Sequence, residues 1–124
     1  ETKYQYFMIG QKMSETNYID GVFQGMNSFW YENGQKSTEV NYINGKREGI
    51  RTEWYENGTI KDVRNYKDGK KDGKVIWWYE NGQIHHEWNY KDGKLDGKGI
   101  EWFENGQIKS EATYKDDVCI SGDC

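Results

Sequence analysis

The chain has 124 residues, of which 34% are hydrophobic and 16% aromatic, with 15 glycines, no proline and a formal net charge of −4. A disordered chain is also poor in apolar residues, but it would not carry six Trp and ten Tyr, so an ordered protein with a thin aromatic core is expected. The negative charge argues against a nucleic-acid-binding protein, which usually has a basic face, and no apolar run reaches the roughly 18 residues of a membrane-spanning helix.

One five-residue phrase recurs along the chain. It reads Trp-Tyr-Glu-Asn-Gly from Trp30, Trp54 and Trp78, and Trp-Phe-Glu-Asn-Gly from Trp102, with a constant step of 24 residues. A fixed period of about 20 to 50 residues indicates a repeat architecture. The four tryptophans therefore mark equivalent positions in successive structural units.

The first repeat is a degenerate copy. Gly10 and Tyr18 keep the repeat spacing, but Met8 and Ile9 replace the acidic turn. Terminal repeats are expected to be atypical, because one side has no neighbour to cover it. The sequence therefore predicts one domain, 1–124, which is divided into a degenerate capping repeat (6–29), three full repeats (30–53, 54–77, 78–101) and a partial terminal repeat (102–124).

Each full repeat contains two turn signals. The first is Glu-Asn-Gly, and the second is Asn44-Gly45, Asp68-Gly69 or Asp92-Gly93, which are strong signals for tight hairpins. The intervening runs are too short for helices and are broken by glycine. The sequence predicts an all-β fold: an elongated, single-layer antiparallel β-meander of tandem 24-residue β-hairpin repeats.

The pairing of the strands follows from the turns. A three-residue Glu-Asn-Gly loop with a glycine bulge sets Trp54 opposite Ile60, whereas a two-residue loop would set Tyr55 there. The bulged turn is preferred because it collects more apolar side chains on one face. That face is predicted to carry a structural ladder whose burial stabilises the sheet. Its members are Trp30, Trp54, Trp78, Trp102, Tyr42, Tyr66, Tyr90 and Tyr114.

The combined motifs, Trp-Tyr-Glu-Asn-Gly-Gln-Ile over 78–84 and Tyr-Lys-Asp-Gly-Lys-Leu-Asp-Gly over 90–97, resemble the MORN repeat in its bacterial variant form. The resemblance extends over nearly the whole chain, and Asp117 departs from it where a turn glycine is expected. It implies an extended, twisted antiparallel sheet that serves as a binding surface without catalysis of its own. Proteins of this kind are often described as bacterial antitoxin or immunity proteins, and relatives elsewhere as membrane-skeleton or phosphoinositide-associated scaffolds.

Two groups of residues are candidates for contact with a partner. The aromatic group is predicted to lie on the face opposite the ladder, where rings among charged neighbours suit a protein interface; it comprises Phe29, Tyr31, Tyr55, Trp77, Tyr79 and Phe103. The acidic group lines one edge of the sheet and can steer a basic partner such as a nuclease toxin; it comprises Glu32, Glu56, Glu80 and Glu104. The alternative interpretation of the charged turns is a solvated rim that keeps the hairpins soluble.

These features favour a non-catalytic protein-binding scaffold of antitoxin or immunity type. The alternatives are a lipid- or cell-surface-associated module that contacts anionic head groups through lysine-rich turns, and a sugar- or choline-binding aromatic repeat. No catalytic residue, metal or cofactor is expected; His85 and His86 would point to opposite faces of a strand. An open sheet also allows a homodimer through an edge or a face.

Cys119 and Cys124 are the only cysteines. They could close a small disulfide outside the cell or stay free thiols inside it. The sequence starts at Glu1 without an initiator methionine, so either the chain was trimmed or an N-terminal export segment was removed. The second explanation, an exported or periplasmic chain, is favoured over a cytoplasmic one.

Overall fold

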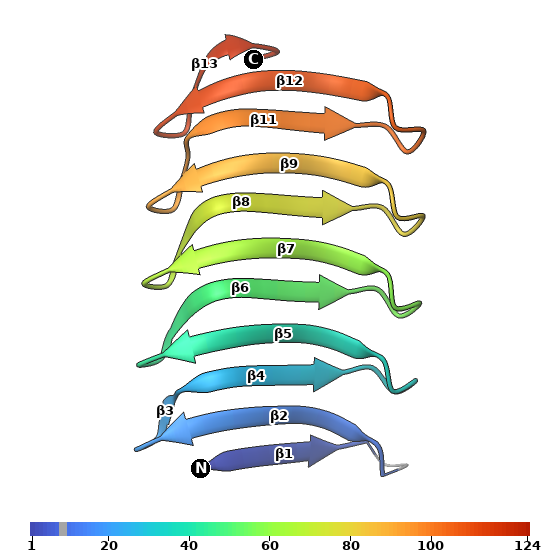
Figure 1. The fold of residues 1–124 in the computed structure, drawn as a ribbon, viewed down its shortest axis with the longest axis vertical. Helices are drawn as coiled ribbons and strands as arrows, with labels where there is room; N and C mark the ends of the chain where they lie inside the picture. The colour runs from blue at the N-terminus through green and yellow to red at the C-terminus, as the bar shows by residue number, and fades with distance from the viewer. Residues whose placement is uncertain (8–9) are drawn as a thin grey trace.

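The computed structural model describes residues 1–7 and 10–124, and all of its regular elements are strands (Figure 1). Met8 and Ile9, the altered turn of the first repeat, lie outside the described residues. No helix that could cross a membrane is found in the described ranges. The strands are β1 (Thr2–Tyr6), β2 (Lys12–Ile19), β3 (Val22–Phe23), β4 (Gly25–Trp30), β5 (Lys36–Ile43), β6 (Lys46–Trp54), β7 (Ile60–Lys67), β8 (Lys70–Trp78), β9 (Ile84–Lys91), β10 (Lys94–Leu95), β11 (Gly97–Trp102), β12 (Ile108–Lys115) and β13 (Val118–Gly122).

The strands form one open 13-stranded sheet in which every pairing is antiparallel. The long strands follow one another in chain order, while the short β3 and β10 pair with β2 and β9. Figure 1 shows the strands stacked along the long axis of the molecule, with no second layer over either face. The predicted all-β, single-layer meander of hairpin repeats is confirmed.

The Glu-Asn-Gly turns have the predicted register, because Trp54 pairs with Ile60. Gly58 has a φ of 88°, a backbone conformation that glycine adopts readily. Its N–H donates to the Tyr55 carbonyl at 2.9 Å. The Asn57 side-chain oxygen accepts a hydrogen bond from the backbone N–H two residues later, also at 2.9 Å. This is a three-residue loop closed by a glycine bulge.

The turns at the other edge are two-residue turns with positive φ at both positions, as their sequences predict. The last of them lacks the glycine: Asp117 has a φ of 70°. Its carboxylate accepts from the Leu95 N–H at 2.7 Å, and its own N–H donates to the Leu95 carbonyl at 2.9 Å. These two bonds hold a non-glycine residue in a conformation that otherwise favours glycine.

The prediction that the Trp and Tyr rows share a face is wrong, because a second bulge follows each Glu-Asn-Gly turn. After the Trp54–Ile60 pair the next pair is Glu53–Asp62, so Lys61 is an extra residue. Two residues of β7 then oppose one of β6, and the alternation of side chains shifts by one position. The side chains from Asp62 onwards therefore share the face of Glu53 and not that of Trp54.

We name the two surfaces by these rows. The tryptophan face carries Trp30, Trp54, Trp78 and Trp102, together with Ile76 and Ile100. The tyrosine face carries Tyr42, Tyr66, Tyr90 and Tyr114 together with Phe29 and Trp77. The prediction that Phe29 and Trp77 lie on the face opposite the tyrosines is therefore wrong.

The buried side chains belong almost entirely to the tyrosine face. Val40, Tyr66, Val75 and Ala112 form its apolar core, whereas all four repeat tryptophans remain half-buried. Among the described residues, no two of those tryptophans stack on each other. The packed column is the tyrosine row. The side chains that lie between successive tyrosines of this row are those of Phe23, Arg47, Lys71 and Leu95.

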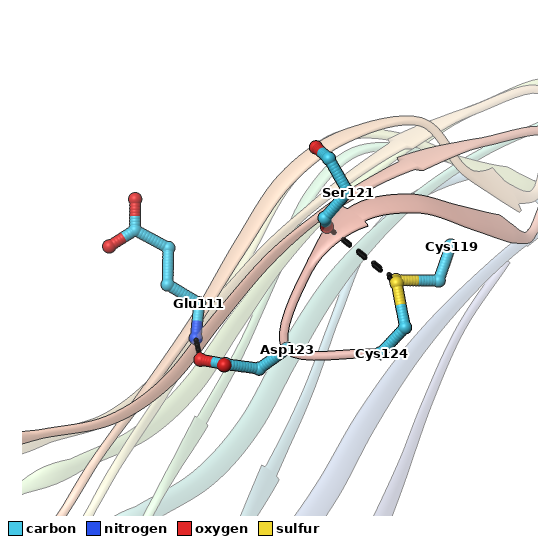
Figure 2. The surroundings of a disulfide bond; sticks show 5 residues. All are labelled: Glu111, Cys119, Ser121, Asp123 and Cys124. Carbon is cyan, nitrogen blue, oxygen red and sulfur yellow. Dashed lines mark hydrogen bonds between the residues drawn. A yellow bond between two sulfur atoms is a disulfide. The ribbon is translucent and has the colours of Figure 1, made fainter.

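The C-terminal edge is closed by a disulfide between Cys119 and Cys124 (Figure 2). Gly122 allows this turn, because a Cβ at that position would collide with the backbone of Glu111. The Glu111 N–H donates to the Asp123 carboxylate at 2.9 Å, and the Glu111 carbonyl accepts from the Asp123 N–H at 2.8 Å. Asp123 thereby satisfies backbone groups of β12 that an open edge would leave unpaired.

Replacing both cysteines by serine should loosen this edge. A crosslink that closes so short a loop is worth about 2 kcal/mol in the chain-entropy model. We expect faster hydrogen–deuterium exchange at the Glu111 amide in C119S/C124S, with unchanged exchange at Val63 in the middle of the sheet. Unchanged protection at Glu111 would show that the tail holds β12 without the disulfide.

Candidate functional site

The tyrosines of the Glu-Asn-Gly turns connect successive repeats. Each hydroxyl donates to the backbone carbonyl of the tryptophan one repeat further on: Tyr31 to Trp54 at 2.7 Å, Tyr55 to Trp78 at 2.6 Å and Tyr79 to Trp102 at 2.9 Å. Burial raises the pKa of Tyr31, with Glu56 and Glu53 adding to the shift. The last turn has Phe103, which has no hydroxyl and is exposed. These rings therefore hold the turns in fixed positions relative to one another.

A Tyr55→Phe variant should lose one such bond and nothing else. A typical hydrogen bond contributes about 1 kcal/mol to stability, so we expect the free energy of unfolding to fall by about that amount. Urea denaturation measures it, with the exposed Tyr4→Phe as the control that should match the parent protein. Equal stability of Tyr55→Phe and Tyr4→Phe would contradict a structural role for the hydroxyl.

Three clefts, which we call the turn clefts, open between successive Glu-Asn-Gly turns. They have volumes of about 420, 470 and 420 Å³. Each contains at least one tyrosine ring and two glutamates from neighbouring repeats. The lining includes Tyr31, Glu32 and Glu56 in the first, Tyr31, Tyr55, Glu56, Glu80 and Lys61 in the second, and Tyr55, Tyr79, Glu80 and Glu104 in the third.

The turn clefts bring together seven of the ten residues predicted to contact a partner. Phe29 and Trp77 lie on the tyrosine face instead, and Phe103 is not among the lining residues of the three clefts. Carboxylates beside an aromatic ring suit a lysine or arginine side chain, through charge-assisted hydrogen bonds and cation–π attraction. The second cleft already contains such a contact: Lys61 is part of its lining, and the Lys61 ammonium lies 5.8 Å from the Tyr55 ring centre.

A different pocket, of about 160 Å³, lies on the tyrosine face across β7, β8 and β9. We call it the face pocket. Aromatic rings and charged groups line it together: Trp77, Trp88, Tyr90 and His86, with Val75, Asp62, Arg64 and Lys71. Only Trp77 of this set was predicted as a contact residue.

The bulge after the third Glu-Asn-Gly turn also corrects the expectation for the histidines. His85 occupies the extra position, as Lys61 does one repeat earlier, so the two histidines do not point to opposite faces. Their Nδ1 atoms lie 3.0 Å apart. His85 stacks on Trp77 at 5.4 Å between ring centres, and His86 stacks on Trp88 at 4.5 Å.

Trp88 is the pocket residue that sequence reasoning missed. It does not follow the 24-residue period, since Arg64 holds the equivalent position one repeat earlier. Its ring covers Gly99, where a Cβ would lie 3.0 Å from Trp88 Cδ1. The sequence signal for this pocket is a pair of departures from the repeat. Trp88 stands where the preceding repeat has Arg64, and Gly99 stands where it has Val75.

The charges beside the face pocket form a cluster around one buried carboxylate. Asp62 Oδ1 lies 3.2 Å from Arg64 Nε and 3.7 Å from Arg51 Nη1, and Arg51 also pairs with Glu53. Within the described ranges, none of the three atoms Asp62 Oδ1, Arg64 Nε and Arg51 Nη1 makes a hydrogen bond of normal geometry. These three atoms are buried against one another, so the ion pairs offset their desolvation without ideal hydrogen-bond geometry.

Two residues that line the face pocket have strongly shifted pKa values. Burial, followed by a hydrogen bond with Glu53, raises the pKa of Asp62 to about 6, against the opposing effect of the arginines. Burial, followed by the charges of His85 and Arg64, lowers the pKa of His86 to about 4. At neutral pH the pocket therefore contains a neutral imidazole. No group of three or more His, Cys, Asp or Glu side chains that could hold a metal is found among residues 1–7 and 10–124.

A single sheet built from hairpin repeats, with its clefts recurring at the same period, defines a repeat-built binding module. Four segments, 23–44, 47–68, 71–92 and 95–116, match the family model described as the MORN repeat variant. Because they cover more than half of the chain, the protein belongs to this family, whose repeats generally serve binding and not catalysis. No curated protein matches the chain significantly.

Proposed function

We propose that the protein is a non-catalytic scaffold of antitoxin or immunity type that holds a basic protein partner along the edge formed by its Glu-Asn-Gly turns. The observation that carries this proposal is the recurrence of the turn clefts. Each contains a tyrosine ring and two carboxylates that can receive a basic side chain, which in the second cleft has to displace Lys61 from the Tyr55 ring. A single cleft of this kind could arise by chance, but three at the repeat period form an extended surface.

The geometry suits a partner with regularly spaced lysine or arginine side chains. Two strands of about 4.8 Å each separate one cleft from the next, which gives a step of roughly 10 Å. That step is close to the Debye length at physiological salt, so the glutamates of distant clefts act mostly independently. A cation over an aromatic ring contributes about 0.5–2 kcal/mol. Three occupied clefts together can then hold a partner that one cleft could not.

The opposite edge provides a matched control. A short arginine-rich peptide serves as the probe, and its affinity is measured at physiological salt for two double variants with the same change in charge. We expect E56Q/E80Q, in the turn clefts, to bind about tenfold more weakly than the parent protein. E48Q/D72N, at the other edge, should stay within roughly twofold. Equal loss in both variants would show that only net charge matters, and would contradict the proposal.

The antitoxin or immunity role has its own test. The protein is co-expressed with the product of the adjacent gene, and growth is scored. The proposal expects growth to be inhibited by that product alone, restored by the parent protein and by E48Q/D72N, and not restored by E56Q/E80Q. An adjacent product that is harmless to the cell, or rescue by both variants alike, would contradict it.

A further inference from the structure

The face pocket is the right size for one side chain. Its volume is about 160 Å³, whereas pockets for small-molecule ligands usually measure about 300–1,000 Å³. Liquid water takes about 30 Å³ per molecule, so the pocket has room for roughly five waters or one amino-acid side chain. It therefore suits a single anchoring residue of a bound protein better than a free cofactor.

The charge in this pocket is positive. Arg64 and Lys71 contribute two positive charges to its lining, and Asp62 contributes one negative charge. His86 contributes none, because burial lowers its pKa to about 4. Behind the lining, Arg51 and Glu53 pair with each other. One positive charge thus remains without a counter-charge, in a site where Asp62 is only 3% exposed and the local dielectric screens weakly.

The hydrogen-bonding groups point to the same chemistry. Arg64 lines the pocket, and its Nε is buried 3.2 Å from the Asp62 carboxylate, so its guanidinium can reach a ligand only through the terminal nitrogens. The Lys71 ammonium lies 5.0 Å from the centre of the Tyr90 ring, and both residues line the pocket. An arginine and a lysine in the lining of one small pocket are suited to a carboxylate.

We propose that the face pocket binds the carboxylate of a glutamate or aspartate side chain from a protein partner, with Arg64 and Lys71 as its cationic groups and the rings of Trp77 and Trp88 around the aliphatic stem. The aromatic walls alone would also suit an ammonium group, but two cations in the lining oppose a third. This inference concerns a different surface and the opposite charge from the turn clefts, so either proposal can fail without the other.

The test uses two capped amino acids that differ only in charge. N-acetylglutamate N-methylamide and its glutamine counterpart are titrated into the full chain, and the indole N–H resonances of Trp77 and Trp88 are followed by NMR. We expect saturable shifts with the glutamate probe and a dissociation constant on the order of millimolar, as a ligand of this size allows. The glutamine probe should bind at least about threefold more weakly. The resonances of Trp54 and Trp102, on the tryptophan face, should not move.

Lysine variants separate a charge effect from a packing effect. Lys71→Gln should weaken binding of the glutamate probe by roughly threefold or more, and Lys71→Arg should restore it. Lys70→Gln removes the same charge from the neighbouring residue, which pairs with Lys67 and lies outside the pocket, and should leave binding unchanged. Equal binding of the glutamate and glutamine probes, tighter binding of choline than of glutamate, or no shift at all would each overturn the proposal.

Discussion

The Tyr66→Ala substitution is expected to lower the free energy of unfolding by about 3 kcal/mol. Tyr66 is 7% exposed and lies in the middle of the packed tyrosine row. The Arg47 guanidinium lies 5.3 Å from its ring centre, and Arg47 Nη1 lies 3.3 Å from its hydroxyl. Removing a buried aromatic ring costs about 3–5 kcal/mol, and the lower end applies because water can enter a single-layer sheet. Urea denaturation measures the difference.

Tyr114→Ala is the control for this prediction. Tyr114 holds the same repeat position in the last hairpin, but it is only half-buried. Its loss should therefore cost clearly less than that of Tyr66. If Tyr66→Ala were as stable as the parent protein while Trp54→Ala were strongly destabilised, the tryptophan row and not the tyrosine row would support the sheet.

Acidification is expected to destabilise the protein through His86. Its folded pKa is about 4, below the ordinary value of 6.5. As the pH falls through about 6.5 the unfolded chain gains a proton that the folded chain does not, so the contribution of His86 to stability is present above that pH and is lost below it. The linkage gives a loss of about 2 kcal/mol between pH 7 and pH 5. The change in urea midpoint between these two pH values, compared between the parent protein and a variant without His86, measures it.

His86→Phe isolates this effect. Phenylalanine can keep the stack on Trp88 but does not titrate. Asp62 acts in the opposite direction, because its raised pKa of about 6 makes the folded chain the better proton acceptor as the pH falls through that value. Asp62 is present in both proteins, so the difference between them reports His86. Identical changes in midpoint for the parent protein and the variant would contradict the assignment.

The period, the turns and the strand register could be predicted because each depends on a few neighbouring residues. Glycine at 58 and the Asn or Asp before each glycine of the opposite edge accept positive φ, and this fixes the hairpins locally. The pairing of Trp54 with Ile60 followed from the same turn. Local chemistry therefore specified the path of the backbone through nearly every repeat.

The assignment of faces could not be predicted from these turns. It depends on the second bulge, whose extra residues are Ser37, Lys61, His85 and Lys109. All four are polar, like ordinary solvent-facing strand residues, so their side chains do not distinguish a bulge from regular pairing. A bulge shifts the alternation of side chains for the rest of the strand. The prediction therefore placed Tyr66 on the wrong face relative to Trp54, and it made the same error for Trp77 and for the histidines. The turn residues were less affected, because a loop position does not depend on the parity of a strand.

The candidate sites divide in the same way. The turn clefts contain Tyr31, Tyr55 and Tyr79, whose importance the repeat made visible although their hydroxyl bonds to the next repeat were not foreseen. The face pocket depends on Trp88 and Gly99, which break the repeat. Residues that keep the period specify the scaffold here, and residues that depart from it specify the pocket.

The most direct test of the central claim compares two peptides of identical composition. One is a proline-rich peptide with an arginine at every third residue, which in a polyproline II helix of three residues per turn places the arginines on one side at a spacing of roughly 9 Å, close to that of the turn clefts. The other carries the same arginines in one block. If the clefts bind side chains at the repeat period, the spaced peptide will bind more tightly, and E56Q/E80Q will abolish the difference. Equal affinity of the two peptides would show that the acidic edge attracts positive charge without recognising its arrangement, and the scaffold as proposed would be contradicted.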